Sequence, residues 1–150
     1  MLLVVDMWTQ DSYEQTSSRG EDWNHTFSMH KVVEDIIRNY DGEKYFFNSG
    51  GEDLKPHEQF ADLEVIQNTN SLPHCNETYL VGPEKTYLCG MHLGRCIDNL
   101  VNKIANPYII LNACVIHSND TLYEVYDEEY NYVWYNYRDK DFTDIEVRFK

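Results

Sequence analysis

The chain has 150 residues, of which 42% are hydrophobic and 14% aromatic, so it can form one globular domain around a single sizeable core. Its formal net charge of −14 argues against nucleic acid and anionic membranes as partners, because both carry charge of the same sign. The apolar runs are too short to span a bilayer, and the first one stops at Asp6 with no basic segment before it. We therefore expect a cytoplasmic protein.

The cysteines stand singly in the sequence, at Cys75, Cys89, Cys96 and Cys114. In a cytoplasmic chain this spread predicts free thiols rather than a disulfide framework. Cys89 and Cys114 fall inside apolar runs, which predicts small core residues. A zinc site could gather His74 and His92 with three of the cysteines, but no CxxC pair and no H-x₃₋₅-H spacing is present. We therefore predict no structural metal and no cofactor.

The hydrophobic pattern alternates between strand-like and helix-like periods along the chain. In chain order it predicts a strand over 1–6, a polar loop over 7–24, an amphipathic helix over 26–40 and a strand over 44–48. A short helix near 56–61, a strand over 63–67, a loop over 68–79 and a helical remnant at 80–81 follow. The second half is predicted as a strand over 85–91, a helix over 94–104, a strand over 108–115, a helix near 121–129 and a strand over 132–137.

This alternation predicts a doubly wound α/β fold, with a mostly parallel sheet in the order 3-2-1-4-5-6 and helices on both faces. The tail 138–150 fits either an added edge strand or an exchange with a partner. In such sheets ligands bind beyond the carboxyl ends of the strands, where the strand order reverses. Asp6 ends the first strand and Cys96 follows the fourth, so we expect both side chains to face the same crevice.

Cys96 stands in the first turn of the predicted helix, where free N–H groups and the helix dipole favour a thiolate. This position, with Arg95 beside it, predicts a lowered pKa for the thiol. The same N–H groups can stabilise an oxyanion, and Asp6 can act as the base that accepts the thiol proton or activates water. The structural alternatives are a small packing residue at Cys96 and a turn cap at Asp6.

Three segments carry a resemblance to a known family. Residues 87–100 (YLCGMHLGRCIDNL) resemble the nucleophile motif of isochorismatase-like cysteine hydrolases, in which a strand reaches a glycine, five residues intervene and a cysteine opens a helix. Residues 3–7 (LVVDM) are similar to the family's first strand, which carries the catalytic Asp and a following Met. Residues 110–113 (ILNA), with Ser118 beyond them, resemble a later strand. The resemblance covers about residues 1–137 in order and spacing.

The resemblance implies that Cys96 is a nucleophile acting with Asp6 and a lysine on small amides such as nicotinamide, ureido or carbamoyl compounds. The acyl group would pass to the thiol as a thioester, which water then hydrolyses. The family also implies homo-oligomers and a cis peptide near Met91-His92. The resemblance implies that this cis peptide helps to aim backbone N–H donors at the oxyanion. The candidate residues for these donors are Met91, His92 and Arg95.

This chain departs from the family pattern after the third strand, where a lysine is usual and Val65-Ile66-Gln67-Asn68 stands instead. We take Gln67 and Asn68, together with Lys55, the nearest lysine in sequence, as possible supporting residues. His92 is a further candidate, as an alternative base or cation. The Asp-x-His metal pattern of the nicotinamidase branch is missing around residues 49–57, so the prediction of no metal stands.

Three functions remain open on these residues. The leading interpretation is a small cysteine hydrolase that acts on an amide-like C–N bond of a small molecule. The first alternative is a catalytically impaired relative that serves as a small-molecule-binding or protein-interaction module, with the acidic, Tyr-rich C-terminal third as the suspected surface. A flavodoxin-like or nucleotide-binding protein ranks last, because no Gly-rich phosphate loop follows the first strand.

Overall fold

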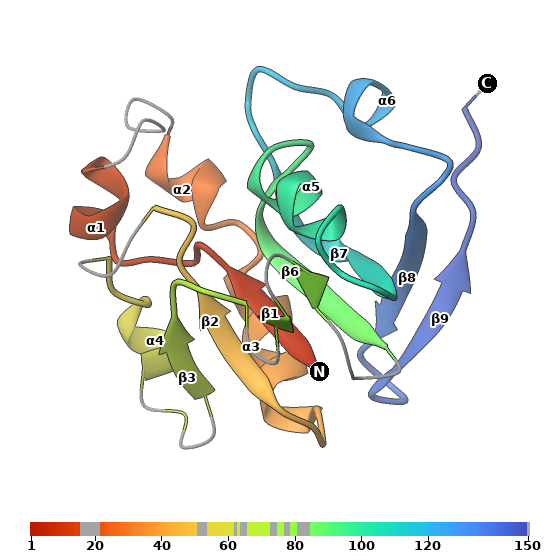
Figure 1. The fold of residues 1–150 in the computed structure, drawn as a ribbon. Helices are drawn as coiled ribbons and strands as arrows, with labels where there is room; N and C mark the ends of the chain where they lie inside the picture. The colour runs from red at the N-terminus through yellow and green to blue at the C-terminus, as the bar shows by residue number, and fades with distance from the viewer. Residues whose placement is uncertain are drawn as a thin grey trace.

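The computed structural model of the protein describes residues 1–15, 22–50, 54–61, 63, 66–72, 75–76, 79–80 and 85–149 (Figure 1). At its centre lies a seven-stranded sheet in the order β3-β2-β1-β6-β7-β8-β9. Its neighbouring strands run parallel from β3 to β8, and β9 pairs antiparallel with β8 at the edge. This confirms the predicted α/β class and strand order, and it places the tail as an added edge strand.

The strands of the sheet are β1 (Leu2–Val5), β2 (Lys44–Phe47), β3 (Ile66–Thr69), β6 (Thr86–Leu93), β7 (Pro107–Ile116), β8 (Asn131–Asn136) and β9 (Asp141–Ile145). A separate antiparallel pair is formed by β4 (Cys75–Asn76) and β5 (Tyr79–Leu80). All four residues of β1 are buried, as its continuous apolar run predicts for a strand covered on both faces.

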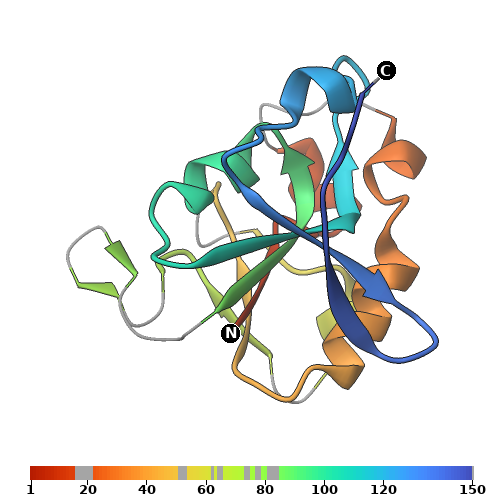
Figure 2. The same cartoon turned by 90° about the vertical axis from the view of Figure 1, so that its right-hand side faces the viewer.

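The helices are α1 (Gln10–Glu14), α2 (Trp23–Thr26), α3 (His30–Asn39), α4 (Glu58–Ala61), α5 (Cys96–Val101) and α6 (Leu122–Val125). Figures 1 and 2 show α3 and α5 on opposite faces of the sheet. Two hydrophobic clusters follow from this. Leu2 and Val4 pack with the apolar stripe of α3, whereas Leu3 and Val5 pack with α5, because successive side chains of a strand point to opposite faces.

Several predicted boundaries are wrong. The helix expected over 26–40 begins at His30, because Thr26 ends α2 and a turn separates the two. The loop expected over 7–24 contains α1, whose first turn is capped by Thr9. The third strand starts at Ile66 rather than at residue 63, and residues 64–65 lie outside the described part of the chain. Leu80 belongs to β5 and not to a helical remnant.

The thiols of Cys89, Cys96 and Cys114 are all free, and the first and last of these are buried in the core, as predicted. The side chain of Cys75 lies outside the description. Within the described ranges, no helix has both the length and the apolar character needed to cross a membrane.

Candidate active site

Three polar side chains meet where β1, β2 and β6 end. Asp6 directly follows β1, Ser49 lies just beyond β2, and Cys96 opens α5 after β6. Val5 is in register with Phe47 of β2 and with Gly90 of β6. Because parallel neighbours end at the same edge of a sheet, these registers bring the following loops together. We refer to Asp6, Ser49 and Cys96 as the site cluster.

Hydrogen bonds join the members of the site cluster through Ser49. The Ser49 amide donates to Asp6 Oδ1 at 2.7 Å, and the Ser49 hydroxyl is hydrogen-bonded to Asp6 Oδ2. Ser49 Oγ also lies 3.4 Å from Cys96 Sγ. A hydroxyl has one proton, so when Ser49 donates to the carboxylate it accepts from the Cys96 thiol. The thiol proton therefore has a hydrogen-bonded route to the carboxylate.

Burial sets the protonation of this cluster. Asp6 is only 4% exposed, and burial raises the pKa of its carboxyl to about 6, although the hydrogen bonds from Ser49 oppose the rise. Burial also raises the pKa of the Cys96 thiol, and the charge of Asp6 raises it further, whereas Ser49 and Arg95 lower it. The lowered pKa that we predicted for Cys96 is therefore wrong, because desolvation and a nearby carboxylate outweigh the end of a six-residue helix.

The backbone around the cluster takes unusual conformations. Asp6 has a left-handed φ of 55°, which short polar residues tolerate better than others and which recurs at functional sites. Gly90 has a φ of 111°, and a Cβ atom there would collide with the carbonyl oxygen of Val5. Glycine at this position therefore permits the close approach of β6 to β1. The Met91-His92 peptide is cis, as the family resemblance implied.

His92 lies near the end of β6, and Arg95 directly precedes α5. The His92 side chain is buried, and its ring neighbours are Tyr13 at 6.4 Å and His117 at 5.3 Å between centroids. The Arg95 guanidinium forms an ion pair with Asp120 at 3.0 Å. The backbone amide of Arg95 donates to the carbonyl of His92. That amide is thus engaged in the turn before α5, and Met91 is a buried β6 residue in register with Val115 of β7.

The three residues considered in place of the family lysine do not join the site cluster. The backbone of Lys55 is hydrogen-bonded to the Thr9 amide and to the Ser12 hydroxyl, in the segment that follows β1. The side chain of Lys55 is exposed. Gln67 and Asn68 lie within β3 rather than beyond it, because the strand extends to Thr69. Arg95 is a cationic side chain that lowers the pKa of Cys96, and its effect is smaller than those of burial, Ser49 and Asp6.

Sequence reasoning missed Ser49 and its neighbour Asn48. Asn48 is buried, accepts from Trp8 Nε1 at 2.6 Å and is hydrogen-bonded to Asn68 of β3, so it ties the loop after β1 to β3. Ser49 directly follows the strand predicted over 44–48 and was not singled out from the sequence. The signal that could have found both is the one that singled out Asp6, namely a polar residue directly beyond the carboxyl end of an inner strand.

No metal-binding group of three or more His, Cys, Asp or Glu side chains is found within the part of the chain that the structure describes. The chain matches no family model, no curated protein and no solved structure. The chemistry that the site cluster supports is therefore judged from its own geometry. A thiol, a hydroxyl and a buried carboxylate in series can move one proton away from sulfur while the sulfur attacks an electrophile.

Proposed function

We propose that the protein is a small cysteine hydrolase acting on an amide-like C–N bond of a small molecule, with Cys96 as nucleophile and Asp6 as base. The observation that carries the proposal is the hydrogen-bonded series from Cys96 through Ser49 to Asp6. The resemblance to isochorismatase-like cysteine hydrolases supports it, because that family uses an Asp and a Cys at the same two places in the fold.

Cys96 starts as a thiol, since its pKa is raised, so the proton must leave during attack. As Sγ bonds to the carbonyl carbon of the amide, the thiol proton passes to Ser49 Oγ. The Ser49 proton passes at the same time to Asp6 Oδ2. A carboxylate with a pKa of about 6 is a well-matched acceptor near neutral pH, because general bases work best close to the operating pH.

The tetrahedral intermediate then carries a negative oxygen. The Arg95 side chain at the N-cap of α5 forms no capping hydrogen bond, and the amides of Cys96 and Ile97 in the first turn are the donors that we assign to this oxygen. When the C–N bond breaks, the proton returns from Asp6 to the leaving nitrogen and a thioester remains on Cys96. Asp6 next accepts a proton from water, which attacks the thioester, and the acid product leaves as the thiol is restored.

Ser49 takes over part of the role that the resemblance assigns to a lysine. A cation beside the sulfur stabilises a thiolate by charge, whereas a hydroxyl offers one hydrogen bond. Once Asp6 is protonated it can donate to Ser49 Oγ, and Ser49 can then donate to the sulfur. This reversal stabilises the developing thiolate without a formal positive charge in direct contact.

The proposal is tested by incubating the protein with nicotinamide, a carbamoyl amino acid and a ureido acid, and measuring ammonia release. Acid-quenched samples are analysed by peptide mass spectrometry for an acyl group on Cys96. We expect ammonia release and an acyl adduct with at least one compound, and neither with Cys96→Ala. Cys96→Ser is the matched control, because it keeps the size and hydrogen bonds of the side chain but not the sulfur.

Two results would overturn the proposal. One is ammonia release by Cys96→Ala at the wild-type rate, which would place the chemistry elsewhere. The other is the absence of both ammonia and adduct with every one of these compounds and wild-type protein. Unfolding curves of both variants must match that of the wild type, so that a lost signal reports the site and not the fold.

A further inference from the structure

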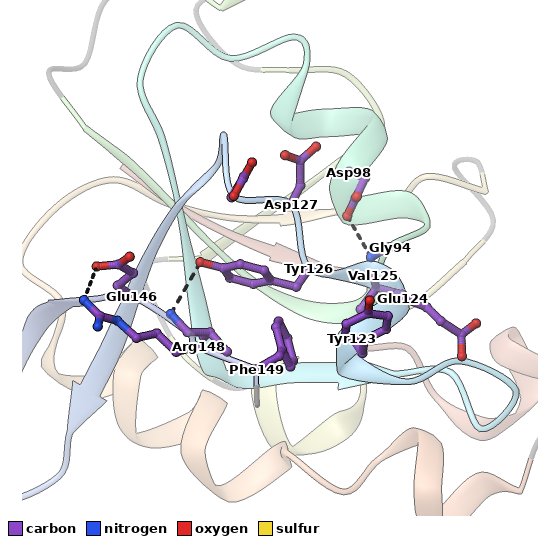
Figure 3. A pocket seen from close by; sticks show the side chains of 12 residues that line it. Gly94, Asp98, Tyr123, Glu124, Val125, Tyr126, Asp127, Glu146, Arg148 and Phe149 are labelled. Atoms are coloured by element: carbon purple, nitrogen blue, oxygen red, sulfur yellow. Dashed lines mark hydrogen bonds and ion pairs between the residues drawn. The ribbon is translucent and has the colours of Figure 1, made fainter.

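An open groove lies on the C-terminal side of the molecule, between the start of α5, α6 and the residues after β9 (Figure 3). Its volume is about 890 Å³, within the range of ligand-binding clefts. None of the site-cluster residues lines it. We call it the aromatic groove, after the rings of Tyr123, Tyr126 and Phe149 in its wall.

Two of the three aromatic side chains in this wall are strongly exposed to solvent. Tyr123 is 73% exposed and Phe149 41% exposed, and their rings meet edge to face with centroids 5.2 Å apart. Phe149 also meets the ring of Tyr126 edge to face at 5.5 Å. Tyr126 is in turn stacked on the buried Tyr132 of β8, which anchors the wall to the core. Adjacent exposed rings of this kind mark surfaces that a ligand covers.

The groove is also strongly acidic. Its carboxylates come from three segments: Asp98, Glu124, Asp127, Glu128 and Glu146. Among the described residues that line it, Arg148 is the one basic residue, and it lies 3.6 Å from Glu146. Figure 3 shows Asp98 and Asp127 on one side of the groove, with the rings beside them.

Within the described chain, the carboxylates of Asp98 and Asp127 bond to backbone amides and not to a lysine or arginine. Asp98 accepts from Gly94 and Asp127 accepts from Glu129. Burial and the charge of Asp127 raise the pKa of Asp98, so the two carboxylates repel each other without a neutralising cation. A cationic group placed between them would relieve this repulsion.

We propose that the aromatic groove binds a partner-protein segment that presents arginine side chains. A planar guanidinium stacks on aromatic faces and donates paired hydrogen bonds to carboxylates, and the groove offers both within one opening. The chain's net charge of −14 attracts such a segment over a longer range. The inference is independent of the proposed hydrolase activity, since it uses none of the same residues.

The groove is formed before any partner arrives. The Val147 amide donates to the Tyr126 hydroxyl at 3.4 Å, which holds the C-terminal residues beside α6. On the other side α6 packs tightly on the turn before α5, where a Cβ atom at Gly94 would collide with Val125. Preformed walls reduce the ordering cost of binding, so a short segment can bind without refolding the surface.

The test uses fluorescein-labelled Gly-Arg-Gly-Arg-Gly peptide and fluorescence anisotropy at physiological ionic strength. The same peptide with citrulline in place of arginine keeps the shape and removes the charge. Asp127→Asn/Glu128→Gln removes two groove charges, and Asp11→Asn/Glu14→Gln removes the same charge from the exposed face of α1. Tyr123→Ala/Phe149→Ala removes two rings, and Trp134→Ala removes an exposed ring outside the groove.

We expect saturable binding of the arginine peptide and about tenfold weaker binding for each of the two groove variants. The variants outside the groove should change the affinity by less than about twofold, since exposed distant charges are largely screened. Equal losses for the two charge pairs would show that overall charge, and not the groove, attracts the peptide, and would overturn the proposal. Equal binding of the citrulline peptide, or no saturable binding to the wild type, would also overturn it.

Discussion

The strands β1, β2 and β6 have polar groups at both ends, and the two ends are organised differently. At the amino end the Met1 ammonium donates to the Tyr40 hydroxyl at 2.6 Å and to the Lys85 carbonyl at 3.0 Å. There too, Lys44 Nζ donates to the carbonyl of Ile37. At the carboxyl end, the groups of the site cluster bond to one another.

This difference is the reason for placing the proposed chemistry at the carboxyl end. At the amino end each charged donor meets a backbone carbonyl or a phenol, and neither takes up a proton near neutral pH. At the carboxyl end a thiol, a hydroxyl and a carboxylate with a pKa of about 6 share protons with one another. The proposed function therefore rests on the end of the strands where proton-exchanging side chains are joined in series. Four predictions test this contrast, from the largest expected effect to the smallest.

Ser49→Ala breaks the series while leaving the nucleophile and the base in place. We expect kcat for any amide that the wild type hydrolyses to fall by about 10² to 10³, the usual cost of losing one hydrogen bond to a developing charge. Ser49→Thr keeps a hydroxyl and should restore much of the rate, and the exposed Ser71→Ala serves as the control. Wild-type kcat in Ser49→Ala would mean that the thiol proton reaches Asp6 without the hydroxyl.

Asp6→Asn tests whether ionisation of the buried Asp6 carboxyl lowers the free energy of unfolding. The folded-state pKa of about 6 exceeds the ordinary aspartate value of 3.8, so the folded protein holds the proton more tightly than the unfolded one between these pH values. Stability contributed by the protonated form is complete below about pH 4 and is lost as pH rises through 6. The loss amounts to at most about 3 kcal/mol, from about 1.4 kcal/mol per pKa unit.

We therefore expect the free energy of unfolding of Asp6→Asn, relative to the wild type, to increase by up to about 3 kcal/mol between pH 4 and pH 7. Urea unfolding across this range measures the difference. Asp11→Asn, at an exposed position of α1, provides a matched carboxylate control and should show no comparable trend. A constant difference between Asp6→Asn and the wild type would show that Asp6 ionises without cost in the folded state.

The sequence was sufficient to place Asp6 and Cys96 at the same edge of the sheet. Continuous apolar runs located the inner strands. The rule that ligands bind at strand carboxyl ends then singled out the polar residues that follow them. The rule for strand carboxyl ends points equally to Asn48 and Ser49, and the register of β2 against β1, which no local pattern encodes, decides that Ser49 is the residue that reaches Asp6. The predicted direction of the Cys96 pKa shift was wrong for a related reason, because the desolvation that raises the pKa depends on neighbours that are distant in sequence.

The predicted helix boundaries were wrong where tertiary packing, and not hydrophobic periodicity, decides where a helix begins. The interruption after Thr26 coincides with Phe27, whose ring stacks on His30 at 4.7 Å and on His57 at 4.2 Å. The second contact joins residues that are far apart in the chain, so the pattern over 26–40 contained no sign of it. The tail was ambiguous because alternation of charge and apolarity suits any edge strand, and only pairing with β8 identifies β9.

The reactivity of Cys96 toward iodoacetamide tests how the charges around the thiol set its pKa. The wild-type thiol should alkylate with an apparent pKa above that of free cysteine. Asp6→Asn removes a negative charge, which should lower this pKa and speed alkylation at pH 7.5 by about tenfold, equivalent to one pKa unit. Arg95→Gln should act in the opposite direction. Peptide mass spectrometry measures the rates, and slower alkylation in Asp6→Asn would contradict the assigned cause.

Tyr40→Phe tests the amino end of the same strands. It removes the hydroxyl that accepts from the Met1 ammonium, and we expect a loss of about 1 kcal/mol in the free energy of unfolding. Tyr45→Phe, whose exposed hydroxyl donates to Glu43, should cost less. Neither variant should change the alkylation rate of Cys96 or amide turnover. If Tyr40→Phe slowed turnover as much as Ser49→Ala does, the two ends of the strands would be coupled, and the chemistry could not be assigned to the carboxyl end alone.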